Sequence, residues 1–137
     1  MSTPARTARR LHAFEYALLR VVPRVDRGER MNAGVLLYCR PLRYLGAGLD
    51  LDTARLRALD PGADLAAIRR ALAAVAEVCE EQPSAGSAGQ QDIGRRFRWL
   101  TAPRSTVVQP GPVHTGLTSD PAAELARLVT ALVRLPR

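Results

Sequence analysis

Three apolar segments, each nine residues long and separated by short polar stretches, occupy most of residues 14–51. In the first segment, apolar side chains fall on both faces when the chain is read with the period of two that a β-strand imposes. Apolar residues on both faces are typical of a central strand. The charged loop after it contains Asp26 and Gly28, which are common turn residues. The segments 14–22, 31–39 and 43–51 therefore predict a three-stranded antiparallel meander.

Two later segments, residues 65–81 and 121–134, repeat apolar side chains at spacings of three and four, as an amphipathic helix does. An aspartate precedes each of them, and another precedes a shorter helical segment at 53–59, so all three have a candidate N-cap. Gly46 and Gly48 fall on one face of the third strand, where we expect a helix or an aromatic ring to pack. The expected fold class is α+β: an antiparallel sheet, begun by the meander and extended by one or two later strands, packed by two main helices.

The patterns are weaker between the two main helices. Residues 105–109 read as a strand, and residues 113–117 extend it past the prolines. Residues 92–101 fit either a helix or a strand. In both cases we expect Phe97 and Trp99 in the core, because the chain has few other aromatic residues.

The length favours one domain, which we place at residues 13–137 behind a flexible basic arm at residues 1–12. Residues 82–91 have the small-residue composition of a surface linker. No apolar run reaches the roughly 18 residues of a membrane helix, and no apolar segment of a secretory signal follows the basic start. We therefore expect a cytoplasmic protein without membrane association. In that compartment Cys39 and Cys79, each within an apolar run, should be reduced and buried thiols.

The charge of the chain is uneven. The formal net charge is +7, and all twenty basic residues are arginine. Residues 1–43 hold nine arginines against three acids, and residues 93–137 hold seven against two, whereas residues 44–92 are acidic. If the two basic blocks share one face of the fold, that face would attract phosphates or an acidic partner.

The segment 95–115 is the candidate binding region. It is basic, polar and punctuated by proline, and it contains no carboxylate. Segments of this kind, lying between better-patterned elements, often carry binding groups, and forked guanidinium donors with hydroxyls suit an anion. The loop at 23–32 can add to it if the first hairpin lies alongside. The candidate ligand-binding residues are Arg20, Arg24, Arg30, Asn32, Arg98, Arg104, Ser105, Thr106, Gln109 and His114.

Several of these residues also have a structural interpretation. Asn32 can cap its loop, beside a bulge or a close backbone approach at Gly34. Arg20 interrupts an apolar strand face, so it is either snorkelling or paired. His114 could serve as the base of a serine or threonine nucleophile, but the segment supplies no acid to orient it. Two histidines and two separated cysteines form no ligand cluster, so we predict no metal and no cofactor.

Three sequence motifs are distinctive: RVVPRVDRGERMNAGVLLYC, then RFRWLTAPRSTVVQPGPVHTGL and DPAAEL. On these stretches the chain resembles the bacterial domain-of-unknown-function family 3037, over about residues 14 to 134. The resemblance implies no assigned activity and no catalytic residues. It implies a HipA-like serine/threonine kinase as a possible partner, because members of this family are encoded beside such kinases.

Three functional hypotheses follow. The first is a small non-enzymatic binding or regulatory protein, which recognises a protein partner or a phosphate-bearing ligand through the surface built from 95–115 and 23–32. The second is a nucleic-acid-binding module that uses the same basic face. The third is an enzyme of phosphoryl or nucleotide chemistry with His114 as acid or base. The lack of any acid in the segment favours binding over catalysis.

Overall fold

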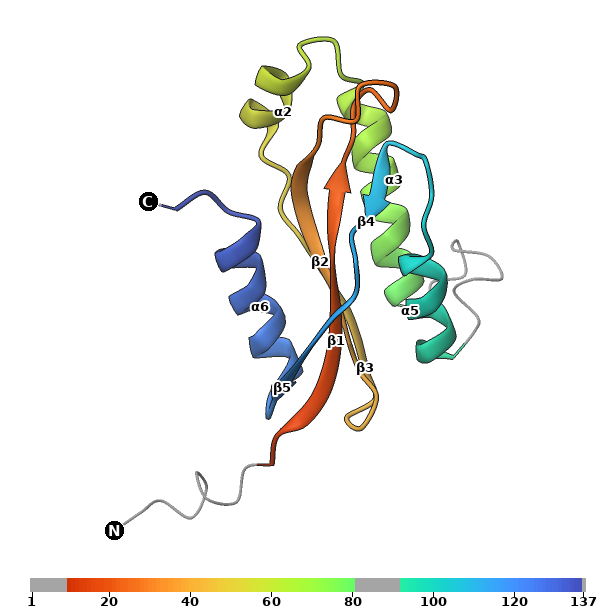
Figure 1. Cartoon of the computed structure of the whole chain (residues 1–137), viewed down its shortest axis with the longest axis vertical. Coiled ribbons are helices and arrows are strands. Elements are labelled where there is room, and N and C mark those ends of the chain that lie inside the picture. Colours follow the sequence, from red (N-terminus) through yellow and green to blue (C-terminus); the bar gives the residue numbers. More distant parts are fainter. Residues whose placement is uncertain (1–9, 81–91, 137) are drawn as a thin grey trace.

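A five-stranded antiparallel sheet organises the protein. The computed structural model describes residues 10–80 and 92–136, shown in Figure 1. The sheet has the order β3-β2-β1-β4, and β5 pairs with β1 beside β4. The first three strands form the predicted meander, and the fold class is α+β as expected. The strands are β1 (His12–Val21), β2 (Met31–Cys39), β3 (Tyr44–Leu49), β4 (Val108–Pro110) and β5 (His114–Thr118).

Four helices accompany the sheet among the described residues. They are α2 (Thr53–Leu59), α3 (Leu65–Cys79), α5 (Ile93–Thr101) and α6 (Pro121–Leu132). An aspartate side chain caps each helix by accepting a hydrogen bond from the backbone N–H three residues later, which satisfies one of the free donors of the first turn. The four caps are Asp52, Asp64, Asp92 and Asp120. The segment 92–101, which fitted either a helix or a strand, is therefore the helix α5 with Asp92 as its N-cap.

The sheet is covered on both faces. Helix α6 packs on β2 and β3 from one side, and α3 and α5 pack from the other, as Figure 1 shows. Strand β2 contributes to both cores: Leu36 faces α3 and α5, and Leu37 faces α6. Strand β1 has neighbours on both edges, which confirms it as a central strand.

Two glycines of β3 make room for their neighbours. A Cβ atom at Gly48 would lie 2.5 Å from Cγ2 of Val129, so α6 approaches the strand closely there. A Cβ atom at Gly46 would meet the ring of Tyr44. Both expectations for this face, a helix and an aromatic ring, are confirmed.

Two strand boundaries and the burial of one residue differ most from the sequence prediction. Strand β1 begins at His12, inside the predicted flexible arm, because His12 pairs with Thr118 of β5. Strand β4 covers Val108–Pro110 rather than the predicted 105–109, and the predicted continuation at 113–117 is the separate strand β5. Trp99 is 46% exposed, whereas Phe97 is buried as predicted. The helical geometry explains the last difference, since Phe97 and Leu100 share the inward face of α5 and Trp99 falls outside it.

Arg96 also lies on that inward face, although it carries a charge. It is 2% exposed, and its Nη1 donates hydrogen bonds to the carbonyl oxygens of Val78 (2.7 Å) and Cys79 (2.9 Å). These carbonyls belong to the last turn of α3, where backbone acceptors lack partners within the helix. A cation there also complements the negative end of the helix dipole. Arg96 therefore fastens α5 to the end of α3.

The two cysteines are free and buried, as predicted, and they lie in different cores. The predicted linker at residues 82–91 lies outside the described residues. Within residues 10–80 and 92–136, no helix has the length and apolar character needed to cross a membrane.

Candidate anion-binding site

The first hairpin and the segment 95–115 meet along one edge of β1. The backbone N–H of Val22 donates to the carbonyl of Val107 at 2.7 Å, and Arg20 is the Cα partner of Gln109. On its other edge, Arg20 is the Cα partner of Asn32. Cross-strand partners place their side chains on the same face of a sheet, so Gln109, Arg20 and Asn32 form a row across three strands.

A β-bulge lies at this row. Leu19 pairs with Gly34 and the next residue, Arg20, pairs with Asn32, which leaves Ala33 without a partner in β1. Bulges of this kind bend a strand and re-aim its side chains. The close approach expected at Gly34 is also present, because a Cβ atom there would lie 2.8 Å from the carbonyl oxygen of Gly48.

The side chain of Arg20 leans over the glycine that follows β4. A Cβ atom at Gly111 would lie 3.0 Å from Cζ of Arg20, so glycine is the residue that leaves space for the guanidinium. Arg20 borders a hollow of about 410 Å³. Thr101 and the proline-rich turn at 110–113 line the same hollow.

Arg20 has a positive neighbour and no acidic one. Partial burial, together with the charge of Arg30, lowers the pKa of Arg20. Among residues 10–80 and 92–136, the guanidinium group of neither arginine donates a hydrogen bond or forms an ion pair. Arg134, by contrast, is bonded to Asp50 at 2.6 Å. Two neighbouring guanidinium groups without a counter-charge produce a local positive potential that attracts anions.

The two amides of the row have structural partners. Nδ2 of Asn32 donates to the carbonyl of Leu132 at 3.1 Å, so Asn32 holds the end of α6 rather than its own loop. Nε2 of Gln109 donates to the carbonyl of Thr106 at 2.8 Å. The hydroxyl of Thr106 donates to the carbonyl of Val108 at 2.7 Å. These hydrogen bonds hold Asn32, Gln109 and Thr106 to nearby backbone carbonyls.

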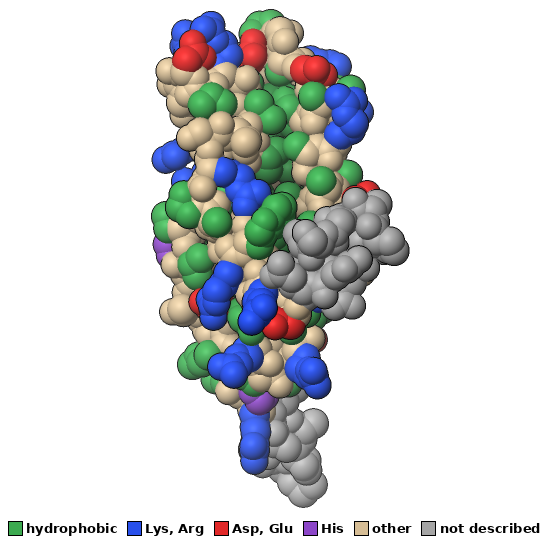
Figure 2. Space-filling model, turned by 90° about the vertical axis from the view of Figure 1, so that its right-hand side faces the viewer, with side chains coloured by type: hydrophobic (Ala, Val, Ile, Leu, Met, Phe, Trp, Pro, Cys, Tyr) green, Lys and Arg blue, Asp and Glu red, His purple; other side chains and the backbone are tan. Residues whose placement is uncertain are grey.

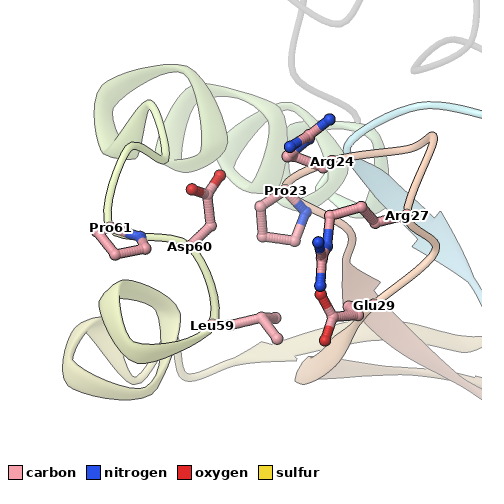
Figure 3. A pocket seen from close by; sticks show the side chains of 7 residues that line it. All are labelled: Pro23, Arg24, Arg27, Glu29, Leu59, Asp60 and Pro61. Atoms are coloured by element: carbon pink, nitrogen blue, oxygen red, sulfur yellow. The ribbon is translucent and has the colours of Figure 1, made fainter.

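Arg24 does not join the row. It donates to the carboxylate of Asp26 at 2.6 Å, and this ion pair raises the pKa of Arg24 and lowers that of Asp26. Arg24 lines a different hollow of about 280 Å³, between the β1–β2 loop and the turn after α2. Figure 3 shows Arg27 and Glu29 pointing toward each other in that hollow, where they form an ion pair at 2.6 Å. Its charges are thus largely matched by its own residues.

The remaining arginines of the predicted set lie elsewhere. Arg98 is exposed on α5, and Ser105 is exposed in the loop after it. The guanidinium of Arg104 stacks on Trp99, 4.8 Å from the ring centre, and lines another cleft. The predicted composite site is therefore divided. The charges of Arg20 and Arg30 interact, whereas Arg24, Arg98 and Arg104 lie elsewhere.

His114 is exposed on β5, where its ring lies 5.3 Å from that of Tyr16 between ring centres. Across the described residues, His114 forms no hydrogen bond with a hydroxyl or a carboxylate. A nucleophile and base need such contact with each other. The geometry around His114 gives no support to the catalytic hypothesis.

Comparison with known proteins identifies the family. No curated protein and no solved structure matches the chain. A family model matches residues 16–133, which is most of the chain and includes most of the sheet, the row at Arg20 and α6. The chain therefore belongs to the family described as protein of unknown function, DUF3037.

Proposed function

We propose that this protein is a non-enzymatic binding protein that recognises a phosphate or carboxylate group of its ligand or partner through Arg20 and Arg30. One observation carries the proposal. Arg20 borders a hollow of about 410 Å³ and interacts electrostatically with Arg30, and no acid among the described residues pairs with either of them.

The chemistry of the guanidinium group supports an oxyanion as the ligand. Its planar fork of donors matches the two oxygens of a carboxylate or phosphate, and hydrogen bonds between charged groups are stronger than neutral ones. The side chain of Arg20 is already confined between the sheet and Gly111. A side chain held in place before binding loses less conformational entropy when the ligand arrives.

The kinase partner implied by the family resemblance stays a prediction. A HipA-like kinase would meet this site through a phosphorylated or acidic side chain. A nucleic acid would meet it through its backbone phosphates, and its affinity would then fall steeply as salt concentration rises.

The test is isothermal titration of inorganic pyrophosphate into the wild-type protein and two matched variants. Arg20→Gln should raise the dissociation constant about tenfold or more, because a hydrogen bond to a charged group contributes about 1.5–3 kcal/mol. Arg98→Gln removes the same charge from an exposed side chain outside the row, and it should bind like the wild type.

Equal affinities of wild type and Arg20→Gln would contradict the proposal. So would an equal loss in both variants, because that would indicate attraction by net charge alone. A short single-stranded oligonucleotide, titrated in parallel at two salt concentrations, distinguishes a nucleic-acid ligand from a smaller anion.

A further inference from the structure

The cleft that Arg104 lines is separate from the hollow at Arg20 and lies between α3, α5 and β4. Its volume is about 380 Å³, near the lower end of the range for ligand pockets. Its floor is formed by small and β-branched side chains: Ala71, Ala74, Val75, Val78 and Val108. Figure 2 shows this side of the molecule, where hydrophobic side chains run down the middle of the upper half and arginines lie at the upper end and over the lower half.

Trp99 forms part of the rim of this cleft. It is the only tryptophan of the chain, and nearly half of its surface is exposed. A large aromatic ring beside an apolar floor leaves a hydrophobic surface in water, which marks interaction sites more often than isolated apolar residues do. Tryptophan is also enriched among the residues that dominate binding energy in protein interfaces.

Arg104 supplies a fixed positive charge at the same rim. Its Nε donates to the carbonyl of Ala102 at 3.2 Å, its Nη2 donates to the carbonyl of Trp99, and its guanidinium lies over the Trp99 ring. Carbonyl oxygens hold the side chain in place without neutralising it. Glu77 is the single acid among the described residues that line the cleft, while Arg98 stands exposed next to Trp99 on α5. The Trp99 end of the cleft is therefore positively charged.

We propose that this cleft docks an acidic peptide segment of a partner protein, with an apolar side chain in the cleft and a carboxylate at Arg104. The apolar floor selects the anchor, and charge complementarity at the rim selects the acid. The volume suits one or two side chains. The inference does not depend on the anion site at Arg20, since the two hollows have no lining residue in common.

The experiment begins with selection of random peptides displayed on phage against the immobilised full-length chain. Selected peptides should combine aspartate or glutamate with an apolar residue. A labelled synthetic copy of the best peptide is then titrated by fluorescence anisotropy. Trp99→Ala and Arg104→Gln should each weaken its binding at least tenfold, and the emission of Trp99 should change on binding to the wild type.

Three controls complete the design. Arg57→Gln and Leu117→Ala remove an exposed arginine and an exposed leucine elsewhere, and both should bind the peptide like the wild type. Trp99→Phe keeps a ring on the rim and should retain more affinity than Trp99→Ala. Melting temperatures of all variants show whether each one is folded.

Peptides without acidic residues, or peptides that bind the Trp99 and Arg104 variants as tightly as the wild type, would overturn the inference. A different occupant would overturn it too. If light scattering shows a dimer that Trp99→Ala dissociates, the cleft holds a second copy of this chain instead.

Discussion

At the scale of single residues, the proposed anion site depends more on Arg20 than on any other side chain. An arginine in an apolar strand face predicts either snorkelling or an ion pair. In the structure Arg20 leans over Gly111, and no acid among the described residues meets it. Which outcome occurs depends on the neighbour across the strand edge, a residue about ninety positions later in the chain. Local sequence patterns do not contain that information.

Gly48 offers a direct test of packing between the sheet and α6. A methyl group there would lie 2.5 Å from Cγ2 of Val129, and the branched side chain has few ways to yield. We expect Gly48→Ala to lower the free energy of unfolding by about 1–3 kcal/mol, as overpacking does. Urea unfolding followed by circular dichroism measures it.

Gly62→Ala is the matched control, because a Cβ atom at Gly62 meets nothing closer than 3.6 Å. The control should stay within about 0.5 kcal/mol of the wild type. Equal stability of the two variants would show that α6 does not approach β3 as closely as described.

Cys79 predicts a pH effect on stability. Burial raises the pKa of its thiol from 9.0 to about 12, so the folded state holds the proton more tightly than the unfolded chain. As pH rises above about 9 the unfolded chain ionises first, and stability falls until the pH reaches about 12. Unfolding free energies of the wild type should therefore decrease more steeply over this range than those of Cys79→Ala. Parallel slopes for the two proteins would contradict the assignment.

At the scale of elements, α5 shows both the reach and the limits of sequence reasoning. Apolar spacing within residues 92–101 fits both helix and strand, and the structure shows a helix with its N-cap at Asp92. Once the helix is known, its inward face follows from the positions of Phe97 and Leu100. Arg96 obscured that face, since a charge interrupts the apolar pattern although its guanidinium bonds the end of α3.

The bond between these two helices can be tested through Arg96. Arg96→Met keeps the length of the side chain but leaves the carbonyls of Val78 and Cys79 without this donor. We expect a loss of about 2–3 kcal/mol in unfolding free energy, because charged hydrogen bonds in a buried site are removed. Arg98→Met on the exposed face of the same helix should change stability little. Similar losses in both variants would assign the effect to helix propensity instead.

One part of the sheet could be predicted from the sequence and another part could not. The meander could be predicted because its strands are adjacent in sequence and their alternation is clear. The pairing of β4 and β5 with β1 could not, since both strands are short and the segment that joins them is rich in proline. That long-range pairing is what brings Gln109 and Gly111 to Arg20.

At the scale of the whole molecule, net charge is a poor guide to the site. Segments of the two basic blocks pair along β1. Yet Arg24, Arg27 and Arg134 have acidic partners, so their charges are partly matched. The sequence could identify the pool of arginines but not which of them meet an acid, because pairing is decided by loop geometry.

The central claim is that Arg20 and Arg30 form an anion site, and NMR tests it most directly. The Nε–H signals of the arginines are followed in nitrogen-15-labelled protein during titration with inorganic pyrophosphate, and Arg20→Gln and Arg30→Gln spectra assign the two signals. We expect saturable shifts of the Arg20 and Arg30 signals, with those of Arg24 and Arg98 little changed. No saturable shift at Arg20, or equal shifts at all exposed arginines, would contradict it.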